Sequence, residues 1–392
     1  MIKKLTLLVA LSFPLGFMPE QAVSAELSQY TAGRVQRAHN LQQDEKLADA
    51  IAMLEGLNLS RAYDKAYVQR MLGVFYWQQN IKTKAIANLT DAVNSGLLQD
   101  EQAWLTQRML ADILLTSEEF KQALPHYYAL SNNVPENQNA DELWLRIAQS
   151  HYQISEWQQS LSAIKTYAEL AGKLDVQPLT IKLGAQLQLK QWKAALPTLE
   201  SLIVLEPNKL VWWQQTAGIQ LRLGQSNSAL DTLALARRQG VDLSQQDLKT
   251  LAQLYAQRGI PERAAIVYSQ LDGADSDVDL LVLQAQYWQI AKEWDKSITV
   301  WRQAAALNNK HRWPLAQLLL QQGHYQQAIA ELDKVKDKAY EADVALAKVR
   351  AYYKLDNLEK AVIFAKQADN IESTTASKSW IKYLSQKREM AS

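Results

Sequence analysis

Glutamine, arginine and large aromatic side chains recur along the chain at a near-constant interval, and these residue types could bind a polypeptide. A primary amide both donates and accepts hydrogen bonds, so a row of glutamines can bind the backbone of an extended peptide. Arginine adds bidentate contacts to carboxylates. The candidate peptide-binding residues are Arg70, Trp77, Gln78, Arg108, Gln149, Tyr152, Gln153, Gln188, Arg222, Gln253, Gln257, Gln286, Gln317, Gln321, Arg350 and Tyr353. The alternative is that glutamine is simply a common solvated residue in this chain.

Catalytic signatures do not occur in the sequence. It contains no Gly-rich phosphate loop ending in Gly-Lys-Ser/Thr, no Gly-x-Ser-x-Gly elbow and no His-Glu-x-x-His zinc helix. The histidines have no metal-ligand spacing, since none pair at i,i+3 or i,i+4; they are His39, His126, His151, His311 and His324. We therefore expect no catalytic centre, no cofactor and no metal site. An enzyme whose site assembles between helices is the alternative.

The first 25 residues have the pattern of an export signal. Lys3 and Lys4 precede an apolar run, and Val23 and Ala25 supply the small residues that a signal peptidase requires. We expect cleavage after Ala25 and a periplasmic protein. A membrane anchor is the alternative, but the apolar run is shorter than the roughly 20 residues that a span needs.

Composition excludes several classes of function. The chain has no cysteine, which excludes disulfides, a thiolate metal site and a lipid-acceptor cysteine. Removal of residues 1–25 leaves equal numbers of basic and acidic residues. This balance favours neither nucleic-acid binding nor adhesion to an anionic membrane, and we expect no stable membrane anchor after cleavage.

Small residues followed by apolar ones recur throughout the chain and predict its fold. With only 13 Gly and 9 Pro among 392 residues, the segments between them favour helices. The small residues are Ala50, Ala85, Ala123, Ser160, Ala195, Ala229, Ala264, Ser297, Ala328 and Ala361, at spacings of 31 to 38 residues. The spacings centre on about 34, the period of the tetratricopeptide repeat. Only a small side chain lets two helix backbones approach to about 8–10 Å, so each position predicts a helix crossing.

Large residues three positions before the small ones are expected to close each turn. They are Leu47, Phe120, Trp157, Trp192, Trp294, Tyr325 and Leu358. Their recurrence at one repeat position favours core packing over a ligand platform. The candidate binding residues fall on the first helix of each unit, at fixed offsets from the small residue.

The predicted fold is all-α: a tetratricopeptide-type α-solenoid of about ten helix-turn-helix units forming a right-handed superhelix, with a C-terminal capping helix. We expect a sub-array of about three units over 26–135, a second of about seven over 136–372, and the cap over 373–392. The polar connection Asn132 to Asp141 is the expected bend.

Two stretches of the N-terminal half resemble a known group of proteins. They are the run Lys65-Ala-Tyr-Val-Gln-Arg-Met-Leu-Gly-Val-Phe-Tyr-Trp77, and the run Arg108-Met-Leu-Ala-Asp-Ile-Leu-Leu115 with Ala123-Leu-Pro-His-Tyr-Tyr128. Together with the signal sequence they resemble gammaproteobacterial tetratricopeptide proteins described as components of TonB energy-transduction systems. The resemblance implies an accessory to proton-motive-force-driven uptake of iron chelates or haem across the outer membrane.

We therefore expect a periplasmic protein-protein interaction scaffold without catalytic activity. The resemblance implies TonB, ExbB, ExbD or an outer-membrane receptor as its protein partners. The alternative is a scaffold for another envelope process, such as outer-membrane protein assembly, polysaccharide export or cytochrome maturation.

Overall fold

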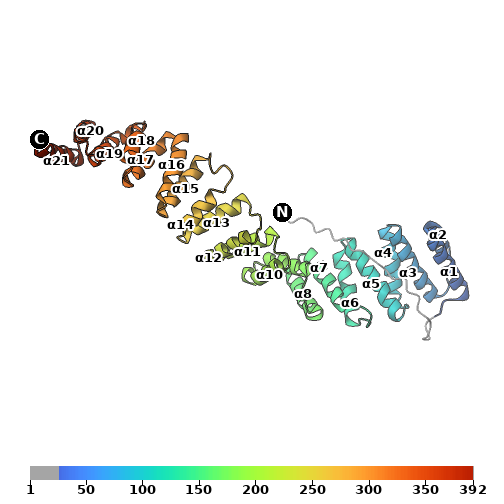
Figure 1. Cartoon of the computed structure of the whole chain (residues 1–392). Helices are drawn as coiled ribbons and strands as arrows, with labels where there is room; N and C mark the ends of the chain where they lie inside the picture. The colour runs from blue at the N-terminus through green and yellow to red at the C-terminus, as the bar shows by residue number, and fades with distance from the viewer. Residues whose placement is uncertain (1–25, 392) are drawn as a thin grey trace. The chain divides into compact units, whose positions relative to one another are not determined.

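The computed structural model describes residues 26–391, and within this range every regular element is a helix. The chain divides between Leu205 and Glu206 into two compact units, each of which is described by itself (Figure 1). The first unit contains α1 (Gln29–Gln43), α2 (Leu47–Glu55), α3 (Ala62–Gln78), α4 (Lys82–Asn94), α5 (Asp100–Thr116), α6 (Phe120–Asn132), α7 (Ala140–Gln153), α8 (Trp157–Ala171), α9 (Val176–Gln188) and α10 (Trp192–Leu205). The predicted signal peptide, residues 1–25, lies outside the described residues.

The second unit continues the same pattern of paired helices. It contains α11 (Leu210–Arg222), α12 (Ser226–Arg238), α13 (Gln245–Gln257), α14 (Pro261–Tyr268), α15 (Val278–Ile290), α16 (Trp294–Leu307), α17 (Arg312–Gln321), α18 (Tyr325–Leu332), α19 (Glu341–Lys354), α20 (Leu358–Ile371) and α21 (Thr375–Ala391). Two short 3₁₀ segments, η1 (Asn309–His311) and η2 (Lys338–Tyr340), precede α17 and α19. The prediction of an all-α chain of ten helix pairs with a terminal helix is confirmed over residues 26–391.

Every helix pair in the described chain closes with the same turn. Three residues separate the two helices of each pair, and the middle residue always has a positive φ. The residue after it donates its backbone N–H to the carbonyl five residues earlier, as Ile81 does to Tyr76 at 2.8 Å. This is the bond of a Schellman motif, which satisfies a carbonyl at the end of the first helix. Glycine fits the left-handed position without strain, and Gly224, Gly259 and Gly323 occupy it.

The recurring small residues lie where the two helices of each pair cross. All ten are on the second helix and have no exposed surface. The two serines also donate across the crossing, Ser160 Oγ to the carbonyl of Ala148 at 2.9 Å and Ser297 Oγ to that of Ala285 at 2.8 Å. The predicted helix crossings are therefore confirmed.

The large residues predicted to close the turns occupy one structural position. Each is the first residue of the second helix of its pair, and each is partly buried. Phe120 and Leu47 pack against the core of the first unit, and Trp294 and Leu358 pack against cores in the second. Their side chains thus contribute to packing in both units.

The terminal helix α21 covers the last pair. It packs on α20, with Leu384 fully buried and Trp380 and Ile381 partly buried against the same core. The connection at 133–139, where a bend was expected, joins α6 and α7, which pack on one another within the first unit. The division into sub-arrays at 135/136 stays a prediction.

Ala229→Leu tests the close approach of the helices. Ala229 is fully buried where α12 crosses α11, so three extra carbons must displace the partner helix. We expect the free energy of unfolding to fall by about 1–3 kcal/mol. Chemical denaturation followed by circular dichroism measures this change. The control Gln257→Ala, at an exposed position, should stay within about 0.5 kcal/mol of the wild type. Equal losses in the two variants would contradict the assignment of faces.

Candidate functional site

The sixteen candidate residues all lie on the first helices of their pairs. In the first unit they are on α3, α5, α7 and α9, and in the second on α11, α13, α15, α17 and α19. We call the surfaces that carry them the first-helix faces, one for each unit.

Eight glutamines of these faces are exposed, and their amides make no hydrogen bond within residues 26–391. They are Gln78, Gln153, Gln188, Gln253, Gln257, Gln286, Gln317 and Gln321. Buried glutamines differ, because Gln186 donates to the carbonyl of Ala194 at 3.1 Å and Gln284 donates to that of Ala274 at 2.8 Å. The exposed amides are therefore available to a ligand.

Gln149 lies among the candidates but is buried. Its Oε1 accepts from Arg146 Nη1 at 3.3 Å, and its Nε2 is buried without an acceptor in the described chain. The sequence pattern did not distinguish this position from the exposed ones. Gln149 thus packs beneath the face and does not present its amide to a ligand.

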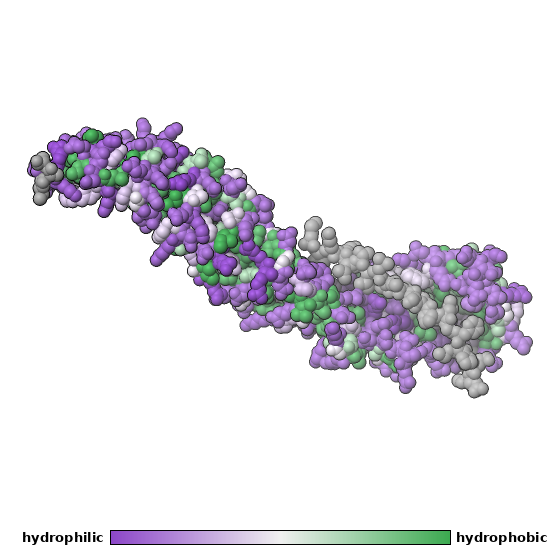
Figure 2. Space-filling view, viewed as in Figure 1, coloured by the Kyte–Doolittle hydropathy of each residue, from purple (hydrophilic) through white to green (hydrophobic). Residues whose placement is uncertain are grey.

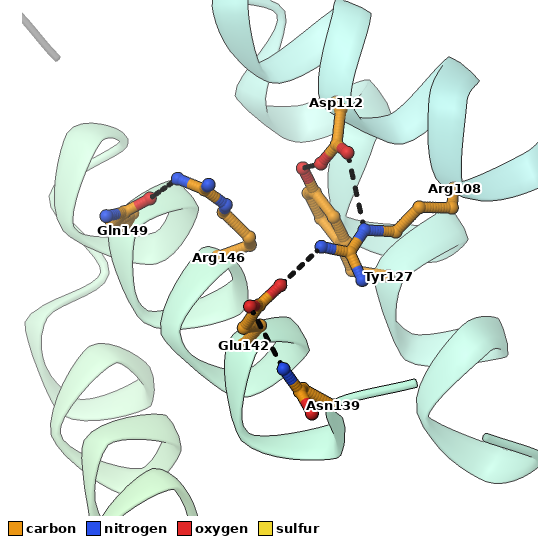
Figure 3. Close-up of polar contacts among 7 residues, drawn as sticks. All are labelled: Arg108, Asp112, Tyr127, Asn139, Glu142, Arg146 and Gln149. Atoms are coloured by element: carbon orange, nitrogen blue, oxygen red, sulfur yellow. Dashed lines mark hydrogen bonds and ion pairs between the residues drawn. The ribbon is translucent and has the colours of Figure 1, made fainter. Parts of the chain in front are cut away.

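Arg108 is held by two carboxylates of its own chain (Figure 3). Its Nε lies 3.3 Å from Asp112 Oδ2 on the same helix, and its Nη2 lies 2.9 Å from Glu142 Oε2 on α7. Asp112 also accepts from the hydroxyl of buried Tyr127 at 2.6 Å. Arg108 therefore joins two neighbouring pairs, and its guanidinium is already occupied by acceptors.

The charges of this cluster reinforce one another. Burial lowers the pKa of Arg108, but Asp112 and Glu142 outweigh this effect and raise the pKa above its usual range. Burial raises the pKa of Glu142, but hydrogen bonds from Arg108 and Asn139 outweigh it and lower the pKa overall. Burial and the nearby Asp112 raise the pKa of Tyr127 well above its usual range. The contact between Arg108 and Glu142 therefore favours the charged form of both groups.

Arg70 occupies the equivalent position on α3 without a carboxylate. Its Nε donates to Thr106 Oγ1 at 3.0 Å, and its guanidinium lies 6.0 Å from the centre of the Tyr67 ring. No Asp or Glu of the described residues lies within ion-pair distance of it. Burial lowers the pKa of Arg70. This half-buried cation therefore lacks a counter-charge from its own chain.

Aromatic residues of the first unit fill space between successive pairs. The Tyr152 ring lies over Gly184 of α9, where an added methyl group would fall 2.5 Å from the hydroxyl. Tyr152 also packs edge-to-face on Trp157, with ring centres 5.0 Å apart. Trp77 is partly buried against the core. Tyr152 and Trp77 thus act at least partly in packing.

Arg222 and Arg350 lie exposed on α11 and α19 of the second unit.

The visible surface of the molecule is largely hydrophilic, with apolar residues in separate small areas (Figure 2). Within residues 26–391, no helix has the length and apolar character that crossing a membrane requires. The same residues contain no group of three His, Asp or Glu side chains placed to hold a metal ion.

The sequence pattern missed Arg146 and Glu142 as parts of this site. Arg146 follows Arg108 by 38 residues, whereas the repeat interval there, from Ala123 to Ser160, is 37, so the period did not indicate Arg146. Glu142 meets Arg108 because α6 packs on both α5 and α7, and no local spacing indicates that contact.

Arg108→Ala tests the structural role of this arginine. The change leaves Asp112, whose side chain is 10% exposed, without its counter-charge. Removing one partner of a buried pair costs about 3–5 kcal/mol, and we expect a loss toward the lower end of that range because Tyr127 still donates to Asp112. Urea denaturation at neutral pH measures it. The exposed control Arg238→Ala should change stability by less than about 0.5 kcal/mol, and a similarly small change for Arg108→Ala would show that the ion pairs are not structural.

Comparisons with known proteins concern the repeat. The family model of the tetratricopeptide repeat matches residues 314–374. No curated protein matches the chain. Among solved structures, a tetratricopeptide repeat protein from Parabacteroides merdae is 14% identical with a TM-score of 0.36, covering 66% of this chain and 99% of its own.

Two further solved structures are similar to parts of the chain. YrrB, described as a TPR protein with an unusual peptide-binding site, is 15% identical with a TM-score of 0.33, covering 46% of this chain and 94% of its own. Naa15/Naa10 bound to HypK-THB is 12% identical with a TM-score of 0.46, covering 92% of this chain and 65% of that one. The residues matched by the family model, 314–374, cover most of α17 and all of α18, α19 and α20, and the other helix pairs share the same turn and buried small residue.

Proposed function

We propose that each first-helix face binds an extended segment of a partner protein. The observation that carries this proposal is the set of eight exposed glutamine amides that have no partner in the described chain. An amide can donate to a peptide carbonyl and accept from a peptide N–H. The glutamines of successive helix pairs can therefore bind the backbone of an extended peptide whatever its side chains are. Tetratricopeptide arrays present curved surfaces suited to such segments.

Unpaired arginines favour an acidic side chain in the segment that binds the first unit. Arg70 on α3 and Arg146 on α7 have no carboxylate within ion-pair distance in residues 26–391. Arg108 lies between them in sequence and is neutralised by Asp112 and Glu142. A carboxylate of the partner would provide Arg70 and Arg146 with the charge-assisted hydrogen bonds that, of these three arginines, only Arg108 receives from the described chain.

The cellular role that we propose is that of an exported accessory to a TonB–ExbB–ExbD system for energised uptake of iron chelates or haem. The export signal pattern of residues 1–25 and the resemblance of the Lys65–Trp77 and Arg108–Leu115 runs to that group support it. In this role the scaffold would work in the periplasm and hold a segment of the energy-transduction complex or of an outer-membrane receptor.

Affinity capture tests the face and the role together. Tagged protein lacking residues 1–25 is incubated with envelope fractions, and captured proteins are quantified by mass spectrometry. We expect a TonB-type protein to be enriched, and Gln153→Ala with Gln257→Ala to reduce its recovery about threefold or more, since each lost hydrogen bond is worth about 0.5–1.5 kcal/mol. Both positions are exposed, so stability should be unchanged.

The matched control is Gln159→Ala with Gln326→Ala, at exposed positions on the second helices α8 and α18. It should capture as the wild type does. Equal weakening by both pairs would refute the assignment of the face. Normal glutamine dependence without any energy-transduction protein would refute only the cellular role.

Arg70→Met tests the arginine contribution. Methionine keeps an apolar stem but removes the charge, so we expect partner capture to fall about tenfold while the free energy of unfolding does not decrease. Wild-type capture should weaken as ionic strength rises, and the variant should show a flatter salt dependence. The exposed control Arg263→Met, on α14, should behave as the wild type. Unchanged capture by Arg70→Met would exclude the arginine contact.

A further inference from the structure

Three aromatic side chains form the walls of a cavity between α19 and the terminal helix α21. The cavity has a volume of about 380 Å³ and is lined by Tyr353, Ala376, Ser379, Trp380 and Tyr383. Only Tyr353 of these belongs to the first-helix face, and the others lie on α21. The site is therefore contained within the second unit and is largely separate from the glutamines.

The rings of this cavity stand edge-to-face and do not cover one another. The interplanar angles are 61° for Tyr353 with Trp380, 68° for Tyr353 with Tyr383 and 78° for Trp380 with Tyr383. The ring centres are 5.5, 5.7 and 6.1 Å apart. Tyr383 is 45% exposed although it belongs to this packed cluster. The exposed part of the cluster, above all the Tyr383 ring, is the surface that an apolar ligand can contact.

The polar groups of the cavity are mostly donors. The Tyr353 and Tyr383 hydroxyls are 2.8 Å apart, so their mutual hydrogen bond uses one hydroxyl proton and leaves the other for a ligand. Lys387 Nζ donates to the Tyr353 oxygen at 3.3 Å, which uses an acceptor site. The indole N–H of Trp380 has no acceptor within residues 26–391. None of the lining residues is a carboxylate, and Ser379 is the remaining polar group.

Charge disfavours a cationic ligand at these rings. Lys387 lies 4.8 Å from the centre of the Tyr353 ring, where a bound cation would otherwise sit. A ligand that suits the cavity is therefore not a cation, offers apolar groups to the rings and accepts hydrogen bonds from the donors. A proline-rich segment meets each condition, because its imide nitrogens carry no N–H and its carbonyls point outward from an extended polyproline II helix.

We propose that the cavity formed by Tyr353, Trp380 and Tyr383 binds a proline-rich polypeptide segment in the polyproline II conformation. Proline rings pack on the exposed surfaces of the aromatic rings, and the Trp380 indole and the free tyrosine hydroxyl donate to the segment's carbonyls. The proposal rests on the proposed function only in taking a polypeptide as ligand, since it uses a different surface.

Fluorescence anisotropy with a fluorescein-labelled oligoproline tests this site in the chain lacking residues 1–25. The reference probe is a Gly-Ser peptide of equal length, which is extended but has no proline rings. We expect the oligoproline to bind at least tenfold more tightly than the reference. Tyr383→Ala should weaken oligoproline binding about tenfold or more. Trp380→Phe keeps an aromatic ring but loses the donor and part of the ring surface, so it should weaken binding about fivefold.

Tyr30→Ala is the matched control, because Tyr30 is an exposed tyrosine of α1 and is 55% exposed. It should leave oligoproline affinity unchanged. Circular dichroism of Trp380→Phe and Tyr383→Ala shows whether each variant is folded. Because Tyr383 is exposed, Tyr383→Ala still tests the site if Trp380→Phe unfolds the protein.

Several results would overturn the proposal. They are equal affinity for the two peptides, oligoproline binding that survives both cavity variants in folded protein, or binding of a linear glucan or an oligoglutamate in place of oligoproline. If oligoproline fails to bind while the glutamine variants still weaken partner capture, this proposal falls and the proposed function stands.

Discussion

The crossing of the two helices in each pair is the contact on which the rest of the described structure depends. Ten alanine or serine residues, each without exposed surface, let the second helix approach the first. At two crossings the serine hydroxyl donates to a carbonyl of the first helix, twelve residues earlier. A larger side chain there would separate the helices and shift every residue that the pair presents. The positions of the exposed glutamines are therefore a consequence of where the small residues lie.

The turn between the helices constrains the pair equally. In all ten pairs the middle residue of the connection is left-handed, yet seven of these residues are not glycine. A left-handed residue other than glycine costs about 1–2 kcal/mol. In each of these helix pairs the Schellman hydrogen bond and the packing of the two helices must therefore offset that cost. Because connection and crossing are the same in each pair, the spacing of small residues was enough to predict where the helix pairs lie.

The binding face was predictable only in part, and the reason is tertiary. Offsets from the small residue place a side chain on the first helix, so the exposure of Gln153 and Gln257 follows from spacing. The burial of Gln149 depends on Arg146 and on neighbouring helices, which no single period encodes. Arg108 is neutralised by Glu142, a residue 34 positions later that reaches it through packing of adjacent pairs. Spacing thus predicts where a residue lies, whereas its availability depends on what its neighbours supply.

Hydrogen-bond satisfaction separates the residues that hold the fold from those that can serve a ligand. Buried glutamines such as Gln186 and Gln284 bond to backbone carbonyls, since an unpaired buried amide would be costly, whereas the exposed ones keep both of their functions free. The aromatic cavity differs again. The hydrogen bond between the Tyr353 and Tyr383 hydroxyls and the donation from Lys387 use acceptor sites on the tyrosine oxygens, and one hydroxyl proton remains available as a donor. A row of glutamine amides suits an ordinary peptide backbone, which offers both N–H donors and C=O acceptors. A cavity rich in donors suits a proline-rich backbone, which offers only C=O acceptors. The two surfaces should therefore select different kinds of segment, and a partner that contains both kinds would be held at two separate points.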